Sequence, residues 1–476
     1  MSRNAKTPER PNAVPGGAPG ADEVSAWFAR AMTAHRQGNL PEAQACYERV
    51  LRERPNHPEA LNFCGILQQQ RGQSTQAEQL LRRAIRAAPD YASAHTNLGN
   101  VLIAQQRFED AIAAYRQAII LKPDEVEACV NLGALLKGLG RLPEALEAYR
   151  WASERRPGDP EIHYRLAYLL AESGQTEEAR AALAITLQTD GTHVGALMLM
   201  GTVLHRLGER EEARAVLGNA VFQLGGTENA LSLLQHWLRL MPDDPVAQHR
   251  LAAWFGGDVP ARASDAYVTD LFDRYADQFD QHLQKLGYRA PTLILERLAG
   301  TLGEPKGLLD VLDAGCGTGL CAPLLRPYAR HLTGVDLSPK MVDKARERGG
   351  YDELVVAELT AFLGERSQAY DLLVSADTLV YFGDLTALCA AAAGAVRPGG
   401  WLAFTVERTE RETAPEGHRL NKSGRYSHTA EYLARTLVAA GFEEPSLAEV
   451  TLRHEGEQPV FGYAVLVRRP NFAQDD

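Results

Sequence analysis

VLDAGCGTGL, residues 311–320, is the stretch that decides the fold of the C-terminal half of this chain. An apolar segment ending in Asp313 runs directly into a turn that carries Gly315, Gly317 and Gly319. Glycine tolerates positive φ and has no Cβ, so the backbone can turn sharply there and let a ligand lie against the start of the next helix. The spacing is G-x-G-x-G, whereas the pyrophosphate of a dinucleotide is typically met by G-x-G-x-x-G. The stretch therefore predicts a nucleotide-like cofactor without phosphates.

A second acidic residue supports this interpretation. Asp336 ends the apolar segment of HLTGVDLSPKM (331–341), which follows the glycine turn in the chain. In a Rossmann-type sheet an acid in this place meets ribose hydroxyls, so Asp336 is expected to accept hydrogen bonds from an adenosine ribose. Met341, one turn into the following helix, is expected to lie on the adenine face.

The two motifs in register resemble those of the class I S-adenosylmethionine-dependent methyltransferases. In that family an acid and one further residue precede G-x-G-x-G, and the ribose acid ends the second strand. The resemblance implies a Rossmann-like α/β domain that binds S-adenosyl-L-methionine. The cofactor-binding residues it implies are Asp313, Gly315, Cys316, Gly317, Gly319, Asp336, Leu337, Met341, Glu358, Leu359, Ala376 and Tyr275.

Two later segments fit the same unit. YDELVVAEL (351–359) offers Glu358 and the backbone amide of Leu359 as readers of the adenine edge, although Glu358 could equally be a solvated strand-end acid. YDLLVSADTLVYFGDL (370–385) is a nearly continuous apolar run, which is typical of a central parallel strand. The resemblance implies that the end of this strand lies near the transferred methyl group, which makes Asp377, Thr378 and Tyr381 candidate site residues. The alternatives for these residues are helix capping and core packing.

The segment before the glycine turn is predicted to be helical. In AYVTDLFDRYADQFDQHLQKLGYRAP (266–291), apolar residues recur at helical spacing, and periodicity alone favours a core-facing stripe. Helices with an F-D-x-x-A-x-x-F-D-like pattern also close over the cofactor in many small-molecule methyltransferases. A lid would exclude water and hold donor and acceptor in line. The matching residues are Phe272, Asp273, Tyr275, Ala276, Phe279 and Asp280.

A polar loop between residues 407 and 430 supplies further candidates. It follows the VRPGG turn, so it is expected over the carboxyl ends of the strands, where ligands bind in open α/β sheets. His428 is a candidate general base, and Arg425 and Tyr426 are candidate substrate-binding residues because a guanidinium matches a carboxylate. The alternative is that Ser427 or Thr429 caps the next helix and the other residues are exposed.

The first half of the chain repeats itself at a regular interval. The clearest copy, residues 92–123, carries Leu98, Gly99, Ala111, Tyr115, Ala118 and Pro123. One interval later in the chain, Gly133 and Tyr149 occupy the places of Gly99 and Tyr115. One interval earlier, Gly65 and Leu81 occupy the same places. The interval is about 34 residues, the length of a tetratricopeptide repeat, in which small residues let two helices approach closely. Weaker copies flank these three, and the pattern decays after Gly225 into a helical pair that could cap the array.

The resemblance to tetratricopeptide repeats implies a concave groove that takes a peptide or another protein. Asn97, Asn100, Asn131 and Lys137 are candidates for lining that groove, and simple solvent exposure is the alternative. The domain boundaries expected from these patterns are a tail at 1–22, a repeat solenoid with a helical cap at 23–256, a linker at 257–265, a methyltransferase domain with its lid helix at 266–470 and a tail at 471–476.

Composition limits the remaining possibilities. A formal net charge of −11 argues against nonspecific nucleic-acid binding. No segment has the apolar length of a membrane helix, and the start of the chain lacks a signal-peptide core, so a cytoplasmic protein with a disordered start is expected. The six cysteines form no C-x-x-C pair and the histidines are dispersed, so no metal site is predicted.

The sequence thus predicts an all-α tetratricopeptide solenoid followed by a class I methyltransferase domain, as in bacterial proteins that combine the two. We expect methyl transfer by direct displacement to an O or N acceptor, either on a small molecule or on a protein or peptide docked by the repeats. Two alternatives remain open. One is an adaptor with a catalytically idle methyltransferase fold, and the other is an NAD-dependent oxidoreductase, which the glycine spacing disfavours.

Overall fold

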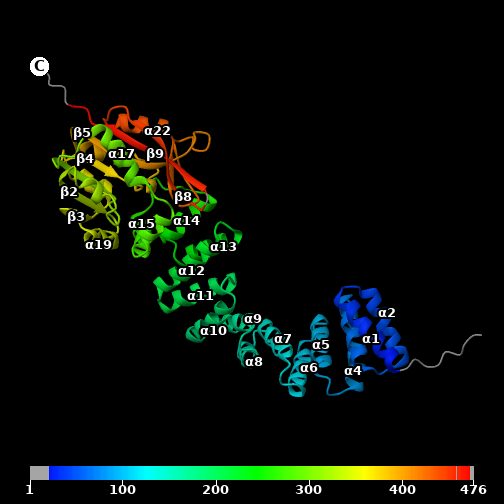
Figure 1. Ribbon diagram of the computed structural model, residues 1–476. Coiled ribbons are helices and arrows are strands. Elements are labelled where there is room, and N and C mark those ends of the chain that lie inside the picture. Colours follow the sequence, from blue (N-terminus) through cyan, green and yellow to red (C-terminus); the bar gives the residue numbers. More distant parts are fainter. Residues whose placement is uncertain (1–20, 457, 472–476) are drawn as a thin grey trace, which may run out of the picture. The chain divides into compact units, whose positions relative to one another are not determined.

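The computed structural model describes residues 21–456 and 458–471, in which an array of helices precedes a mixed α/β sheet (Figure 1). This confirms the predicted fold class. The chain divides into two compact units, Met1–Ala213 and Arg214–Asp476. The predicted boundary between solenoid and linker at residues 256 and 257 stays a prediction.

The helices before the sheet are α1 (Ala21–Arg36), α2 (Leu40–Glu53), α3 (Pro58–Gln70), α4 (Ser74–Ala87), α5 (Ala92–Ala104), α6 (Phe108–Leu121), α7 (Val126–Gly138), α8 (Leu142–Arg155), α9 (Pro160–Glu172), α10 (Thr176–Thr189), α11 (Val194–Leu207), α12 (Arg210–Leu224), α13 (Glu228–Leu240), α14 (Pro245–Phe255), α15 (Asp265–Tyr275), α16 (Phe279–Lys285) and α17 (Ala290–Leu302).

Glycine and tyrosine recur together in the repeats because each pair forms one close contact. A Cβ placed on Gly99 in α5 would lie 2.6 Å from the buried ring of Tyr115 in α6. The same geometry recurs one repeat later, where a Cβ on Gly133 would lie 2.8 Å from Tyr149. The missing side chain on one helix therefore makes room for the large one on its partner.

This contact predicts opposite effects for two glycines of α7. Gly133→Ala is expected to destabilise the protein by about 1–3 kcal/mol, because a packed ring must shift. Gly138→Ala is expected to be neutral or to stabilise by up to about 1 kcal/mol, since nothing lies within 4 Å of its added Cβ and alanine favours a helix. Urea unfolding of the full chain, followed by far-UV circular dichroism, measures both. Equal effects of the two substitutions would contradict this packing account.

The asparagines predicted to line a groove connect neighbouring repeats. The Asn97 amide donates to Asn62 Oδ1 at 2.9 Å, and the Asn131 amide donates to Asn100 Oδ1 at 3.2 Å. Asn100 and Asn131 also line a shallow hollow together with Phe108 and Leu139. The ammonium of Lys137 lies 3.8 Å from the centre of the Tyr168 ring. Contact between these residues and a partner stays a prediction.

The sheet of the second unit has a Rossmann-like order. Strands β3, β2, β1, β4 and β5 lie side by side and parallel, and β9 pairs antiparallel with β5 and with β8. The short strand β7 pairs with the end of β5, and β6 pairs with β7. The strands are β1 (Leu309–Ala314), β2 (Ala329–Asp336), β3 (Glu353–Val356), β4 (Tyr370–Ser375), β5 (Val396–Arg408), β6 (His418–Leu420), β7 (Tyr426–His428), β8 (Ser446–Glu455) and β9 (Gln458–Arg468).

Helices pack on both faces of this sheet, which explains its nearly continuous apolar strands. Leu312 belongs to one buried cluster and its neighbour Val311 to another, as expected when successive side chains point to opposite faces. The carboxyl ends of β1, β2 and β4 meet at one edge and hold the glycine turn and Asp336. The elements between the strands are α18 (Ala322–Leu325), α19 (Pro339–Arg348), α20 (Leu359–Gly364), the short 3-10 helix η1 (Leu379–Tyr381), α21 (Thr386–Ala395) and α22 (Ala430–Ala439).

None of the helices within residues 21–456 and 458–471 combines the length and the apolar character needed to span a bilayer.

Candidate active site

A pocket opens where the parallel strands end. It encloses roughly 1020 Å³ of space, part of it open to solvent, and draws its walls from the strand ends, from α15 and α16, and from the loop before β7. Most of the residues that the sequence predicted for cofactor or acceptor binding lie in its wall. These are Gly315, Cys316, Gly317, Asp336, Leu337, Glu358, Leu359, Ala376, Asp377, Thr378, Tyr381 and Arg425.

The glycine turn forms the floor of the pocket. Gly315, Gly317 and Gly319 have φ of 79°, 53° and 83°, a region that side chains other than glycine rarely adopt. A Cβ on Gly315 would lie 2.1 Å from Thr378 Oγ1, so this position has no room for a side chain. Gly319 is absent from the lining because it packs against Ala345 and Tyr351. The third glycine therefore serves packing between the turn and α19.

Asp336 is fixed by backbone amides. Its Oδ2 accepts from the Gly317 N–H and its Oδ1 from the Ser338 N–H, both at 2.9 Å. Burial raises the pKa of Asp336, and these backbone N–H groups act against that rise. Each carboxylate oxygen can accept more than one hydrogen bond, so the group can also bind the two hydroxyls of a ribose.

Asp313 lies behind the turn and not in the pocket wall. It is fully buried, and Tyr351 donates its hydroxyl proton to Oδ2 at 2.6 Å. Its Oδ1 has no hydrogen-bond partner among the described residues. Burial raises the pKa of Asp313 to about 7, although the Tyr351 hydrogen bond opposes this.

Glu358 combines two roles that the sequence posed as alternatives. It caps α20, where its Oε2 accepts from the Ala361 N–H at 2.8 Å. Its Oε1 is buried without a hydrogen-bond partner among the described residues, and the residue lines the pocket. One oxygen thus serves the fold and the other is available to a ligand.

The predicted lid consists of two short helices. Phe272 of α15 and Phe279 of α16 both line the pocket and meet edge to face, with ring centroids 5.8 Å apart. The neighbouring aspartates connect these helices to the loops at the strand ends, because Ser338 donates to Asp273 and Thr318 donates to Asp280, each at 2.5 Å. A role as a lid stays a prediction.

Tyr275 was predicted to bind the cofactor, but the structure does not bring it to the pocket wall. The helical stripe breaks into a turn after Tyr275, which leaves this residue 44 % exposed and outside the pocket lining. Met341, expected to cover the adenine, does not lie in the pocket wall either. Its side chain lies on the buried face of α19 and is fully buried.

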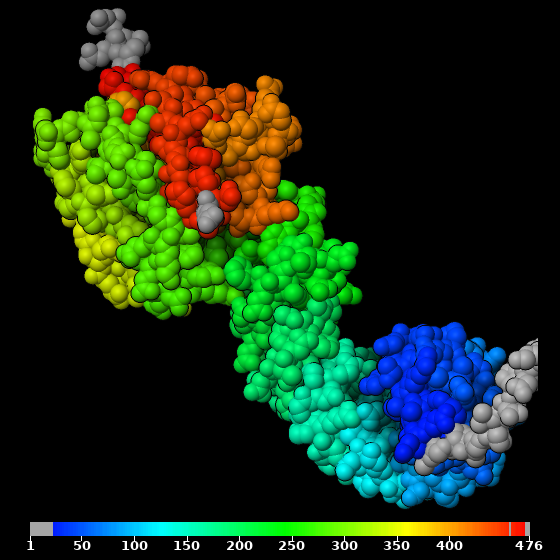
Figure 2. All heavy atoms as spheres, turned by 45° about the vertical axis from the view of Figure 1, so that its right-hand side comes forward, coloured from blue at the N-terminus to red at the C-terminus, as the bar shows by residue number. Residues whose placement is uncertain are grey.

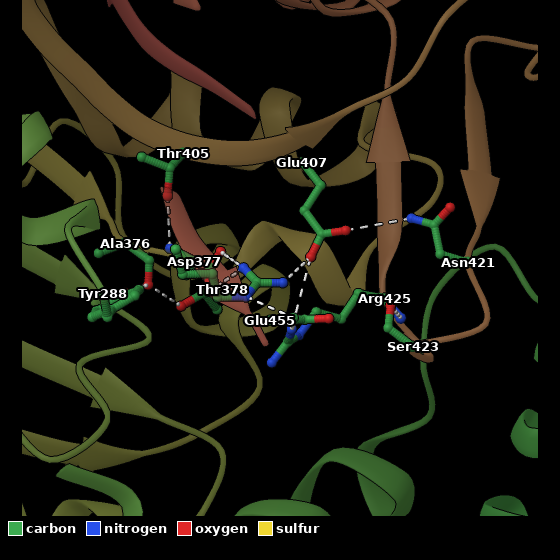
Figure 3. A network of polar contacts seen from close by, with 11 residues as sticks. Tyr288, Ala376, Asp377, Thr378, Thr405, Glu407, Asn421, Ser423, Arg425 and Glu455 are labelled. Carbon is green, nitrogen blue, oxygen red and sulfur yellow. Dashed lines mark hydrogen bonds and ion pairs between the residues drawn. The ribbon is translucent and has the colours of Figure 1, made fainter. Parts of the chain in front are cut away.

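A buried network of charges lies beside the pocket at Asp377 (Figure 3). Arg453 is 1 % exposed, donates to Asp377 Oδ2 at 3.1 Å and to Glu455 at 3.0 Å, and pairs with Glu407. Arg425 donates to Glu455 Oε1 at 2.8 Å. Asp377 itself has φ of 58°, and its N–H donates to Thr405 Oγ1 at 2.9 Å. A non-glycine residue held in this strained conformation beside a pocket is typical of functional sites.

Arg453 was not predicted from the sequence as a site residue. Strand β8 has a register irregularity between Thr451 and Arg453, so the alternation of inward and outward side chains does not place this arginine. The wall residues Leu283 and Tyr288 were also not predicted as pocket residues, although both lie in the segment 266–291 that was predicted to be helical.

His428 does not fit the role of a general base. It is fully buried outside the pocket lining, and its Nε2 bonds to the Gly383 carbonyl at 3.0 Å. Tyr426 is also buried away from the pocket, where its hydroxyl donates to the Pro260 carbonyl at 2.6 Å. Thr429 caps α22, as the structural alternative predicted. Strand β7 turns the Tyr426 and His428 side chains into the core, and only Arg425 before it reaches the pocket.

The burial of His428 predicts that it stays neutral at physiological pH. Burial lowers its pKa to about 4, below the usual value near 6.5. The unfolded state therefore binds more protons between pH 4 and 6.5, and roughly 3 kcal/mol of stability is lost as the pH falls through this range. Proton NMR can identify the His428 imidazole signal as the one missing in His428→Gln. A titration midpoint near 6.5 for this signal would contradict the burial argument.

Fold and site together define a Rossmann-like α/β domain, with a glycine-lined pocket at its strand ends, that follows an array of helical repeats. A profile of the methyltransferase-domain family matches residues 312–404, and tetratricopeptide-repeat profiles match residues 22–90, 65–126, 138–190 and 194–219. The chain carries N-terminal tetratricopeptide repeats and a C-terminal class I S-adenosylmethionine-dependent methyltransferase domain.

Three curated relatives resemble the C-terminal domain. Malonyl-[acyl-carrier protein] O-methyltransferase of Salmonella typhimurium is 30 % identical over 146 residues, which cover 31 % of this chain and 55 % of that protein. Methyltransferase-like protein 27 of Homo sapiens is 39 % identical over 115 residues, 22 % of this chain and 47 % of that protein. Ubiquinone biosynthesis O-methyltransferase of Xanthomonas axonopodis is 31 % identical over 165 residues, 33 % of this chain and 64 % of that protein. The chain spans about half to two thirds of the length of these relatives.

Solved repeat proteins show weaker similarity. The type IV pilus biogenesis factor PilW is 19 % identical with a TM-score of 0.39, over 45 % of this chain and 100 % of that chain. The tetratricopeptide protein YrrB is 20 % identical with a TM-score of 0.33, over 43 % of this chain and 96 % of that chain.

Proposed function

We propose that this protein is an S-adenosylmethionine-dependent methyltransferase whose acceptor atom is an oxygen. The observation that carries the proposal is the carboxylate of Asp336, held by two backbone amides at the rim of a glycine-lined pocket. The G-x-G-x-G spacing of that turn differs from the G-x-G-x-x-G typical of a dinucleotide pyrophosphate site, which disfavours an NAD-dependent oxidoreductase. The intact pocket weighs against an adaptor with an idle domain.

The residues present fit the cofactor. Asp336 can accept both ribose hydroxyls, while the unpartnered Oε1 of Glu358 and the N–H of Leu359 can meet the polar edge of the adenine. Gly315 and Gly317 let the ligand lie against the backbone. When bound, S-adenosylmethionine supplies an electrophilic methyl group attached to sulfur.

The acceptor end of the pocket is formed by Asp377, Tyr381, Arg425 and Arg262 beside the ring of Phe272. These side chains would align an acceptor oxygen with the methyl carbon and exclude water. Transfer would form a carbon–oxygen bond as the carbon–sulfur bond breaks, with the electron pair of the broken bond remaining on sulfur. A hydroxyl acceptor must also lose its proton, and the carboxylate of Asp377, which lines the pocket, is the group that we propose accepts it.

Two of the three relatives described above are named O-methyltransferases, which favours oxygen over nitrogen as the acceptor atom. The repeats bear on whether this oxygen belongs to a small molecule or to a protein. Tetratricopeptide repeats are protein-interaction modules, so a partner or a protein acceptor can dock on them.

Incubation of the full chain with lysate and methyl-labelled S-adenosylmethionine tests the proposal. We expect label in either the protein or the small-molecule fraction, in an alkali-labile ester or a stable ether linkage, and none with Asp336→Ala. Label on nitrogen would overturn the choice of oxygen. Absence of labelled product, together with binding of the cofactor, would favour the adaptor alternative.

A further inference from the structure

Helix α14 lies against the loop that carries Arg425. Its His249 Nε2 donates to the Gly424 carbonyl at 2.9 Å, and its Trp254 Nε1 donates to the Lys422 carbonyl at 2.8 Å. Figure 2 shows the orange segment around β6 and β7 in contact with the green helices of this part of the chain. Two side chains from outside the sheet therefore fix two of the carbonyls just before Arg425.

The loop has little freedom between its neighbours. His249 is 3 % exposed, and its ring lies 4.0 Å from the ring of Tyr267 in α15. Gly424 has φ of 84°, and a Cβ there would lie 2.6 Å from the Tyr267 hydroxyl. Inside the loop, the Asn421 N–H donates to the Arg425 carbonyl at 2.8 Å and the Gly424 N–H donates to the Asn421 carbonyl at 2.9 Å. The loop is thus clamped by α14 and α15 as a single tight turn.

The clamp acts directly on the acceptor end of the pocket. Arg425 follows Gly424 immediately, lines the pocket and donates to Glu455, which also binds the buried Arg453. A shift of the Gly424 carbonyl would therefore move the guanidinium and loosen its place in the charge network around Asp377.

Helix α14 is itself firmly anchored within the second unit. Asp244 caps its first turn by accepting from the N–H groups of Val246 and Ala247 at 3.0 and 3.2 Å. Arg214, in α12, donates to the other Asp244 oxygen at 2.6 Å, and Asp244 is 2 % exposed. The clamp on the Arg425 loop therefore has a rigid base.

We propose that His249 and Trp254 are positioning residues for acceptor binding, because they hold the Lys422–Gly424 turn that presents Arg425 to the pocket. The inference rests on the proposed function in so far as the Arg425 end receives the acceptor. It makes α14, which the sequence placed in the cap of the repeat array, part of the methyltransferase site.

The test compares three variants of the full chain by amide hydrogen exchange. His249→Leu removes the bond to Gly424, His249→Gln keeps a donor near the same place, and Trp254→Phe removes only the bond to Lys422. His163→Leu is the matched control, because His163 is a buried histidine of α9 whose Nε2 bonds to the Pro157 carbonyl at 2.9 Å.

We expect the Asn421 and Gly424 amides to exchange at least about tenfold faster in His249→Leu, with a smaller rise in Trp254→Phe. Protection should return in His249→Gln and stay unchanged in His163→Leu. The affinity for S-adenosylhomocysteine should stay within about threefold of the wild type, since Asp336 and Glu358 are untouched. Transfer of the labelled methyl group to the acceptor should slow, because the KM for the acceptor rises while kcat stays similar.

Unchanged amide exchange in the loop of His249→Leu would overturn the proposal. A loss of affinity for S-adenosylhomocysteine as large as the rise in the acceptor KM would also overturn it. Failure of the wild type to bind S-adenosylhomocysteine would instead refute the proposed function, while the exchange data would still report on the clamp. The two failures are therefore distinguishable.

Discussion

Asp336→Ala is expected to weaken the binding of S-adenosylhomocysteine by about 100-fold or more. The substitution removes the acceptor for both ribose hydroxyls, and each hydrogen bond to a charged group contributes roughly 1.5–3 kcal/mol. It also frees the Gly317 and Ser338 amides that Asp336 fixes, so the glycine turn loses its shape. Calorimetric titration of the full chain measures the change.

Asp343→Ala is the matched control for this experiment. Asp343 lies on α19 close to Asp336 in the sequence, but it is exposed and forms an ion pair with Arg346. Its loss should leave the affinity within about twofold of the wild type, since exposed ion pairs contribute little. If Asp336→Ala also stayed within that range, the ribose assignment would be wrong.

Arg453→Leu is expected to destabilise the methyltransferase domain by about 3–5 kcal/mol, because removing one partner of a buried ion network leaves the remaining charges uncompensated. Here Asp377 and Glu407 would lose the cation that lies between them, and burial already raises the pKa of Glu407. Thermal unfolding of the full chain measures the loss, and methyl transfer should fall with it because Asp377 lines the pocket.

Arg408→Leu separates this effect from the removal of any arginine. Arg408 ends β5 and pairs with Glu410 and Glu449, both of which are exposed. Its loss should cost less than about 1 kcal/mol. A similar cost for the two substitutions would contradict the role given to the buried network.

Much of the fold could be predicted from local patterns. Gly99 and Tyr115 recur one repeat later as Gly133 and Tyr149 because the same helix contact is made again, so the repeat is visible in the sequence. Asp336 could be placed because a strand end, a ribose and a glycine turn impose a fixed order along the chain.

Three predicted site residues lie outside the pocket wall for a shared reason. Met341, Tyr275 and His428 were given roles from their distance along the chain, but the direction of each side chain is set by a helix face, a broken helix or a strand face. Patterns of spacing do not specify that direction when the element ends or shifts nearby.

Contacts between distant segments could not be predicted from one sequence. His249 and Gly424 lie far apart along the chain, and nothing in either segment indicates the other. Arg453 lies beyond a register shift in β8, which hides the fact that it points inward. The end of the pocket at Arg425 depends on such contacts.

Calorimetric titration of the unmodified full chain with S-adenosylmethionine, S-adenosylhomocysteine and NAD tests the central claim most directly. The pocket described here should bind both sulfur-containing nucleosides with one-to-one stoichiometry and should not bind NAD. Binding of NAD without binding of S-adenosylhomocysteine would contradict the account.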